Sequence, residues 1–229
     1  MSRILLVEDD PGVRRGVVMG LTRLGHDLEA VGDGWDALDS VATDPPDVVV
    51  LDLMIPGLNG IDVCRRIRTM STLPIVILSA RDHDLDILQG FEAGADDYCV
   101  KPASAEVIDA RIRAVLRRAA PSSTNDRPLP EVGVFGDLEI DRESLRVRKA
   151  GNDIPLTPTE LRLLLFLSAQ LDRVFSRQEL LEQVWEHNFY GEVRLVDACV
   201  TRLRSKIETD PGSPGHIQTV RGFGYRFSP

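Results

Sequence analysis

The sequence lacks long apolar runs and paired cysteines. No stretch approaches the roughly 18 consecutive apolar residues of a membrane span, and the start, MSRILLV, has neither the charged region nor the long apolar core of a signal peptide. The three cysteines, Cys64, Cys99 and Cys199, are far apart and form no CxxC pair. We therefore expect a cytoplasmic protein with reduced thiols and no membrane partner.

The sequence also lacks a strongly basic segment. Its net charge is −9, and from His187 to the end 6 basic residues stand against 4 acidic ones. The chain is therefore not a polycation, and we expect any positively charged surface at its C-terminal end.

A chain of 229 residues is long enough for two domains of about 100 residues each. The segment AAPSSTNDRPLPE (119–131) has three prolines, several small polar residues and no hydrophobic periodicity, which is typical of a linker. We therefore predict a first domain over residues 1–118 and a second over residues 132–229.

Apolar runs and helical patterns alternate through the first of these domains. Residues 4–7, 48–51 and 75–78 are short, almost continuous apolar runs, as expected of parallel strands buried on both faces. Residues such as Val13 and Val17, or Ile108 and Ile112, recur at helical spacing. This alternation predicts an α/β domain with a doubly wound parallel sheet.

Polar residues follow the predicted strands where each strand ends. The acids Glu8, Asp9 and Asp10 follow the first run, Asp52 and Ser79 follow the next two, and Lys101 follows a fourth. A single polar residue at such a place more often caps the next helix than binds a ligand. Because the carboxyl ends of parallel strands form the functional edge of such sheets, we expect this set to converge in one crevice.

Several carboxylates are tolerable in one crevice when a divalent cation lies among them. Mg²⁺ takes one or two carboxylates and shares its shell readily with phosphate. An aspartate beside it can accept a phosphoryl group, with an ammonium group neutralising the oxygens. We therefore predict Asp52 as the acceptor, Asp9 as the main metal ligand assisted by Glu8, and Lys101 as the countercharge.

The motifs ILLVEDD, VVVLDLMIPGLNG, VILSA and ADDYCVKP, in this order, resemble the receiver domain of two-component response regulators, a flavodoxin-like fold. The resemblance implies that a sensor histidine kinase phosphorylates Asp52. It also implies that the Met54 backbone carbonyl completes the Mg²⁺ ligands and that Ser79 and Lys101 contact the phosphoryl group. Tyr98 matches an aromatic switch position that turns inward, and Pro102 suggests a cis peptide bond.

Two alternatives remain open at this point. Phosphatases of the haloacid dehalogenase type also use an aspartyl nucleophile with Mg²⁺, but they place a second acid where this chain has Met54. The other alternative is a winged-helix regulator that acts without phosphorylation, because Ala103 replaces the usual phenylalanine after Lys101–Pro102. We expect that the protein is not an enzyme.

The resemblance also implies a homodimer that forms on phosphorylation through the fourth helix, fifth strand and fifth helix. One customary Arg–Glu pair of this face is replaced by the apolar pair Ile87 and Val107. The other matching positions are Glu92, Asp96, Asp97, Arg111, Arg113 and Arg118. A solvated charged surface is the alternative reading, because exposed ion pairs contribute little individually.

The second domain opens with strand-like segments, followed by two helix starts. Thr157, Pro158 and Glu160 form one predicted capping box, and Ser176 with Glu179 forms another. The later segment VRLVDACVTRLRSKIE (193–208) is amphipathic. We expect Val196, Val200, Leu203 and Ile207 to face the core, and Arg194, Ala198, Thr201 and Ser205 to face outward, with Arg202, Arg204 and Asp197 at the edges.

These helices, followed by the hairpin-like TVRGFGYRF, resemble the winged helix-turn-helix domain of the OmpR/PhoB subfamily, an α+β fold. The resemblance implies that residues 193–208 form a recognition helix on double-stranded promoter DNA, with tandem half-sites and RNA polymerase as a further partner. The implied DNA contacts are Arg194, Thr201, Arg202 and Arg204, with Arg221 of the hairpin in the minor groove.

Overall fold

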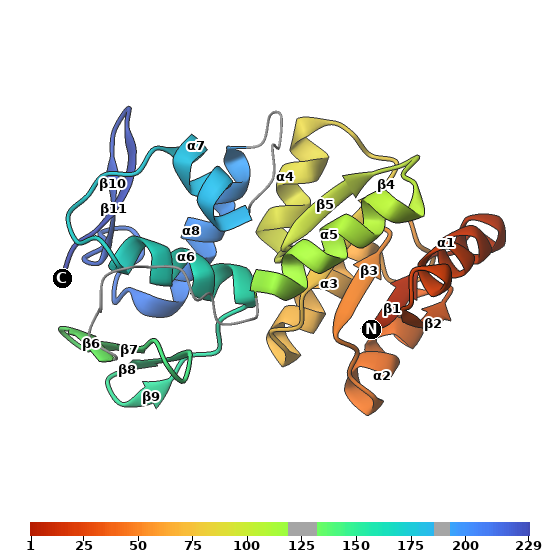
Figure 1. Ribbon diagram of the computed structural model, residues 1–229, viewed down its shortest axis with the longest axis horizontal. Coiled ribbons are helices and arrows are strands. Elements are labelled where there is room, and N and C mark those ends of the chain that lie inside the picture. The colour runs from red at the N-terminus through yellow and green to blue at the C-terminus, as the bar shows by residue number, and fades with distance from the viewer. Residues whose placement is uncertain (119–131, 186–192) are drawn as a thin grey trace. The chain divides into compact units, whose positions relative to one another are not determined.

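Five short strands form one parallel sheet in the first half of the chain (Figure 1). They are β1 (Arg3–Val7), β2 (Asp27–Val31), β3 (Val48–Leu51), β4 (Ile75–Ser79) and β5 (Asp97–Val100). Their order across the sheet is β2-β1-β3-β4-β5. The strand order therefore reverses between β1 and β3, where α/β sheets bind their ligands.

Five helices connect and cover these strands. They are α1 (Pro11–Arg23), α2 (Gly34–Thr43), α3 (Gly60–Met70), α4 (Asp84–Ala93) and α5 (Ala105–Arg118). Ile108, Ile112 and Val115 of α5 pack with Val50 and Val76 of the strands in a fully buried cluster. The helices α2, α3 and α4 contact one another in sequence. The doubly wound α/β prediction is confirmed.

The structure, a computed structural model, describes residues 1–118, 132–185 and 193–229. The chain divides into two units, Met1–Arg117 and Arg118–Pro229. The predicted linker, residues 119–131, lies outside the described residues. No helix in the described parts of the chain is long and apolar enough to cross a membrane.

The first helix begins because Asp10 caps it. The Asp10 carboxylate accepts hydrogen bonds from the backbone N–H groups of Gly12 and Val13, at 2.7 and 2.8 Å, and Pro11 occupies the first helical position. Those hydrogen bonds hold the pKa of Asp10 below its usual range. The third acid of the opening motif therefore has a local structural role, as such residues commonly do.

The second unit begins with an antiparallel sheet and continues with helices. The sheet holds β6 (Val132–Phe135), β7 (Leu138–Asp141), β8 (Arg146–Lys149) and β9 (Asn152–Asp153). The helices are α6 (Pro158–Ser168), α7 (Arg177–Leu180), which runs into one π-helical turn (Leu181–Trp185), and α8 (Arg194–Ile207). A hairpin of β10 (Ile217–Val220) and β11 (Gly224–Phe227) ends the unit.

Both predicted capping boxes are present. The Thr157 hydroxyl accepts the N–H of Glu160, whose carboxylate accepts the N–H of Thr157, and Ser176 and Glu179 do the same at α7. Helices α6 and α8 then pack against each other, and Val196, Val200 and Leu203 of α8 are fully buried. The prediction of an α+β winged-helix unit is confirmed.

Two glycines of α1 make a matched test of helix packing. A Cβ at Gly20 would overlap the Cβ of Ala105 in α5, whereas a Cβ at Gly16 would meet nothing within 4 Å. We expect Gly20→Ala to lower the free energy of unfolding by about 1–3 kcal/mol through overpacking. Gly16→Ala should raise it by about 0.5–1 kcal/mol. Urea denaturation measures both, and equal effects at the two positions would contradict the close α1–α5 contact.

Candidate functional site

The register of the sheet brings two of the predicted acids together. Val7 of β1 lies opposite Leu51 of β3, so that Glu8 and Asp52 follow neighbouring strands at the same level. The Asp52 N–H donates to the Val7 carbonyl at 2.9 Å, which fixes the two strand ends against each other. Both carboxylates are buried, so the sheet alone brings two like charges into one protected place.

Lys101 joins these two carboxylates from the end of β5. Its Nζ donates to Glu8 Oε2 at 2.5 Å and to Asp52 Oδ2 at 2.6 Å, and the Lys101–Pro102 peptide bond is cis, as predicted. Burial works to lower the pKa of Lys101, but hydrogen bonds and charge from Asp52 and Glu8 outweigh it and raise that pKa. Lys101 therefore remains an ammonium group, whose positive charge offsets the charge of the two carboxylates.

The acidic residues fit a hard divalent cation. One carboxylate oxygen each from Glu8, Asp9 and Asp52 lies within 4.8 Å of the others. Burial raises the pKa of Glu8, and the charge of Asp52 adds to this rise while Lys101 opposes it. A cation among these oxygens would relieve that repulsion, and carboxylate oxygens are the ligands Mg²⁺ prefers.

Met54 and Ser79 border the same crevice. The Met54 N–H donates to Asp52 Oδ1 at 2.9 Å, so both carboxylate oxygens of Asp52 have a donor, and the Met54 side chain is exposed. Ser79 is fully buried, and its hydroxyl accepts the N–H of Arg81 at 3.4 Å. Of the predicted strand-end residues, Glu8, Asp9 and Lys101 therefore lie beside Asp52, whereas Asp10 caps α1.

Tyr98 lies inside the fold. Its ring packs edge-to-face on Phe91, its hydroxyl donates to the Arg81 carbonyl at 2.8 Å, and Gly90 leaves room for it, since a Cβ there would lie 3.3 Å from the ring. Burial raises the pKa of Tyr98 to about 12. The inward orientation predicted for a switched state is thus the one this structure has.

Arg81 lies beside Met54, although it was not among the predicted site residues. Its guanidinium contacts the Met54 sulfur at 3.1 Å and the Asp86 carboxylate at 2.9 Å. The residue stands two places after Ser79, on the loop that leads to α4. Proximity to a strand end was the only available signal for it.

The predicted dimer face is partly buried within the chain. Asp96 and Asp97 are fully buried, Asp96 in an ion pair with Arg68 at 2.6 Å and Asp97 near Arg111 at 3.5 Å. Ile87 is 8% exposed, whereas Val107 is 45% exposed. Of the other predicted positions, Glu92 is exposed, Arg113 is exposed and paired with Asp109, and the Arg118 side chain lies outside the described residues.

One side of α8 differs from its prediction. Ala198, expected to face outward, is buried, because α8 contacts α7 as well as α6 and more of its circumference is covered. Arg194, Thr201 and Ser205 are exposed as predicted. The exposed surface of this helix is therefore narrower than a simple amphipathic pattern gives.

Arg202 and Arg204 are engaged within the unit. Arg202, whose side chain is 15% exposed, donates to Glu160 at 3.2 Å, and Lys206 donates to the same carboxylate at 2.7 Å. Arg204 donates to the Ile217 carbonyl at 2.6 Å and to Thr219 at 2.8 Å. These contacts fix α8 on α6 and on the hairpin, a role for both arginines that the sequence prediction did not include.

Asp197 and Tyr225 complete the link between α8 and the hairpin. Asp197 Oδ1 accepts hydrogen bonds from the Tyr225 hydroxyl and from Arg177, each at 2.6 Å. Burial raises the pKa of Tyr225 to about 12, and Asp197 adds to the rise. Arg221, by contrast, is exposed at the turn of the hairpin.

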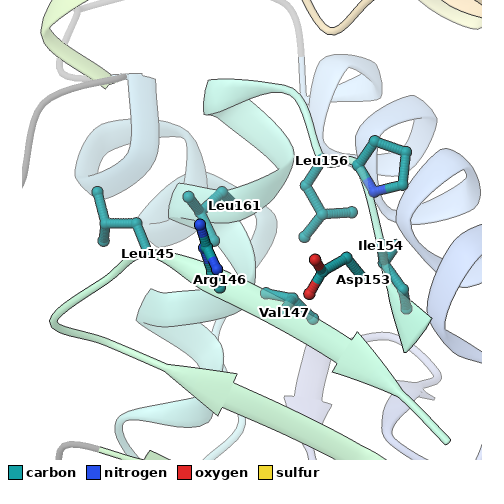
Figure 2. A pocket seen from close by; sticks show the side chains of 8 residues that line it. Leu145, Arg146, Val147, Asp153, Ile154, Leu156 and Leu161 are labelled. Carbon is teal, nitrogen blue, oxygen red and sulfur yellow. The ribbon is translucent and has the colours of Figure 1, made fainter. Parts of the chain in front are cut away.

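A separate hollow of about 300 Å³ lies in the second unit between β8, β9 and α6 (Figure 2). Its lining is mostly apolar, and Arg146 and Asp153 are its charged members. It lacks the converging carboxylates and ammonium group found around Asp52.

Two family models match the chain. The model described as "Response regulator receiver domain" matches residues 4–113, and the model described as "Transcriptional regulatory protein, C terminal" matches residues 151–227. The matched segments follow the two structural units.

The sequence similarity to known proteins extends over the whole chain. The transcriptional regulatory protein AfsQ1 of Streptomyces coelicolor is 51% identical, covering 100% of this chain and 99% of that protein. The DNA-binding response regulator MtrA of Mycobacterium tuberculosis is 44% identical over 100% of this chain and 97% of MtrA. Among solved structures, the OmpR/PhoB homolog DrrB of Thermotoga maritima is 35% identical with a TM-score of 0.51 over 100% of both chains. A RitR mutant is 28% identical with a TM-score of 0.77, covering 100% of this chain and 99% of that one.

Glu160 and Glu179 test how α8 is held, because they share a capping role and differ in burial. Burial alone would raise the pKa of Glu160, but Arg202 and Lys206 outweigh it and lower that pKa. Glu160→Gln leaves two cations without their buried partner and should lower the free energy of unfolding by about 3 kcal/mol. Glu179→Gln, at an exposed cap, should have a clearly smaller effect.

The pH dependence provides a second measurement for the same pair. Because the folded-state pKa of Glu160 is lowered, its contribution to stability is present above the unfolded pKa and is lost as the pH falls through the folded value. Denaturation curves recorded from neutral to acidic pH should therefore show less loss in Glu160→Gln than in the wild type. A stability–pH profile unchanged by Glu160→Gln would contradict this assignment.

Proposed function

The chain belongs to the OmpR/PhoB family of response regulators, and from that premise we propose that Asp52 is the residue that carries its signal. The protein is a two-component transcriptional regulator, so a histidine kinase and DNA are its partners. The observation that carries the proposal is Lys101, which bridges Glu8 and Asp52 at the β1/β3 switch point. We also propose that residues 1–118 are the receiver, 119–131 a linker and 132–229 the effector.

The phosphoryl transfer uses the Asp52 carboxylate as nucleophile. One of its oxygens forms a bond to phosphorus while the P–N bond of a kinase phosphohistidine breaks; the bond electrons stay on nitrogen, and the ring, protonated on its other nitrogen, leaves as neutral imidazole. Glu8, Asp9, Asp52 and the Met54 carbonyl would hold Mg²⁺, which would neutralise charge on the phosphoryl oxygens. Lys101, already within 2.6 Å of Asp52, exchanges a carboxylate contact for a phosphoryl contact.

Ser79, Lys101 and Tyr98 respond to the charge of the added phosphoryl group. Ser79 and Lys101 lie at adjacent strand ends, and the Lys101 N–H donates to the Ser79 carbonyl at 2.8 Å. Tyr98 connects this region to the loop before α4 through the Arg81 carbonyl. We assign Tyr98 as the switch that transmits occupancy of Asp52 to the α4–β5–α5 face.

That face then pairs two receivers. Val107, Glu92 and Arg113 are at its surface, whereas Ile87, Asp96 and Asp97 support it from within. We propose that the exposed Val107 is the central apolar contact and that the exposed charges orient the pair. Arg111 and Arg118 complete the proposed face.

Two paired regulators place two effector domains on tandem half-sites of promoter DNA, roughly one helical turn apart. We propose that Arg194 and Thr201 meet the major groove and that Arg221 meets the minor groove. Arg202 and Arg204 remain near the DNA while they fix α8 on Glu160 and the hairpin. RNA polymerase is the proposed further partner at the promoter.

A regulator that acts without phosphorylation is the second candidate. The buried position of Tyr98 favours it, because its hydroxyl already donates to the Arg81 carbonyl before α4. The variant Asp52→Asn distinguishes the two candidates in reporter assays of the target promoter. It should inactivate a phosphorylation-dependent regulator and leave a phosphorylation-independent one unchanged.

Substitutions of Asp52 and of the nearby Asp10 test directly which residue accepts the phosphoryl group. Asp52→Asn should abolish covalent labelling by acetyl phosphate in the presence of Mg²⁺, because an amide replaces the carboxylate that is proposed to attack phosphorus beside Lys101. Asp10→Asn, which alters a helix cap in the same motif, should retain labelling. Intact-mass spectrometry measures the adduct, and persistent labelling of Asp52→Asn would move the acceptor elsewhere.

The dimer face is tested at an exposed position. Val107→Asp places a charge in the proposed apolar contact and should weaken phosphorylation-promoted dimerisation roughly tenfold or more. Met70→Asp is the control, since Met70 is also exposed but ends α3, outside this face. Sedimentation velocity with and without phosphodonor measures the association, and an unaltered Val107→Asp dimer would remove this face from the proposal.

A further inference from the structure

Phe223, at the turn of the β10–β11 hairpin, is an aromatic side chain left in solvent. It is 71% exposed, and among the described aromatic residues only Trp35, at 55%, is exposed to a comparable extent. Removing such a side chain from water is favourable in proportion to the apolar area buried. A contact that buries the Phe223 ring when the protein acts would therefore be favourable.

The turn that carries Phe223 is well fixed. The Phe223 N–H donates to the Val220 carbonyl at 2.9 Å, and β11 is bonded to Phe175 by two backbone hydrogen bonds between Phe175 and Tyr225, at 2.8 and 3.0 Å. Gly224 has a φ of +147°, and a Cβ there would overlap the Phe175 backbone. The exposure of Phe223 is thus a consequence of a defined hairpin.

The same hairpin is tied to the helix proposed to read DNA. Arg204 of α8 donates to the Ile217 carbonyl and to Thr219 of β10, and Asp197 of α8 accepts from Tyr225 of β11. These bonds hold the turn in a set position relative to α8. A surface that engages DNA through α8 therefore brings the turn to a set place on the same duplex.

The charge of the hairpin fits a polyanion. Residues 216–227 contain two arginines, Arg221 and Arg226, and no acid. Arg226 is held by Gln218, at 2.8 and 3.0 Å, whereas Arg221 is exposed two residues from Phe223. An arginine beside an exposed aromatic ring matches a groove in which phosphates alternate with apolar sugar surface.

We infer that Phe223 is a second DNA-contact residue of the hairpin, packing on the deoxyribose wall of the minor groove beside Arg221. The inference rests on the proposed DNA-binding function and extends it. The two residues then contribute by different physics. Arg221 displaces counterions, so its contribution depends on salt, while Phe223 buries apolar surface and contributes equally at all salt concentrations.

The salt dependence of binding separates these contributions. The full-length chain is titrated, at several KCl concentrations, into a fluorescent duplex selected by the wild-type chain from a random-sequence pool. Phe223→Ala should raise Kd about tenfold at every salt concentration. Arg221→Ala should instead lower the slope of log Kd against log salt by about 1.

Three further variants and one measurement make the result decisive. Val134→Ala, at a 65% exposed apolar residue of β6, should bind as the wild type. Phe223→Trp should recover most of the affinity, since it restores an aromatic face. The double variant Phe223→Ala with Arg221→Ala should show both changes together, and thermal unfolding of Phe223→Ala should match that of the wild type.

The outcomes distinguish the inference from the function it extends. A Kd of Phe223→Ala equal to that of the wild type overturns the inference and leaves DNA binding intact. A loss in Phe223→Ala accompanied by a reduced salt slope also overturns it, because the affected contact is then ionic. Failure of the wild-type chain to select any duplex overturns the proposed DNA binding and the inference with it.

Discussion

The bridge from Lys101 to Glu8 and Asp52 is the interaction on which the first unit depends. Two buried carboxylates at adjacent strand ends repel each other strongly in a protein interior. A single ammonium group at 2.5 and 2.6 Å neutralises much of that repulsion, while the nearby Asp9 stays exposed. A phosphoryl group and a cation would exchange these contacts without removing the need for them. The site therefore already holds the ammonium group that an added negative charge would need.

The second unit uses charge in a corresponding way. Glu160, fully buried, ties Arg202 and Lys206 of α8 to α6, and Asp197 ties α8 to the hairpin through Tyr225. Several charged residues of a helix with a basic pattern thus fix its position. What remains exposed is a small set of side chains that includes Thr201 and Arg221. The exposed basic surface of α8 is therefore smaller than its sequence pattern suggests, in a chain of net charge −9.

Local features were predictable from the sequence because their causes lie within a few residues. The capping boxes of Thr157 with Glu160 and Ser176 with Glu179 formed as predicted, since cap and partner are three residues apart. Ala198 was placed wrongly, because a helical pattern gives the angle of a side chain but not how many neighbouring helices cover it. The inward ion pair of Arg202 and the inward hydrogen bonds of Arg204 were missed for a related reason, since long side chains can turn back toward the core.

The sequence by itself determined the alternation of strands and helices, the strand-end positions of Asp52, Ser79 and Lys101, and the family to which these motifs are similar. Each follows from periodicity or from short motifs, which need no knowledge of distant contacts. Only the tertiary structure decided that Lys101 bridges Glu8 and Asp52 and that Tyr98 lies inward. It also decided that Ile87 and Asp96 are buried while Phe223 is exposed. Those outcomes depend on packing between residues far apart in the chain, and burial and electrostatic partners exist only once that packing is complete.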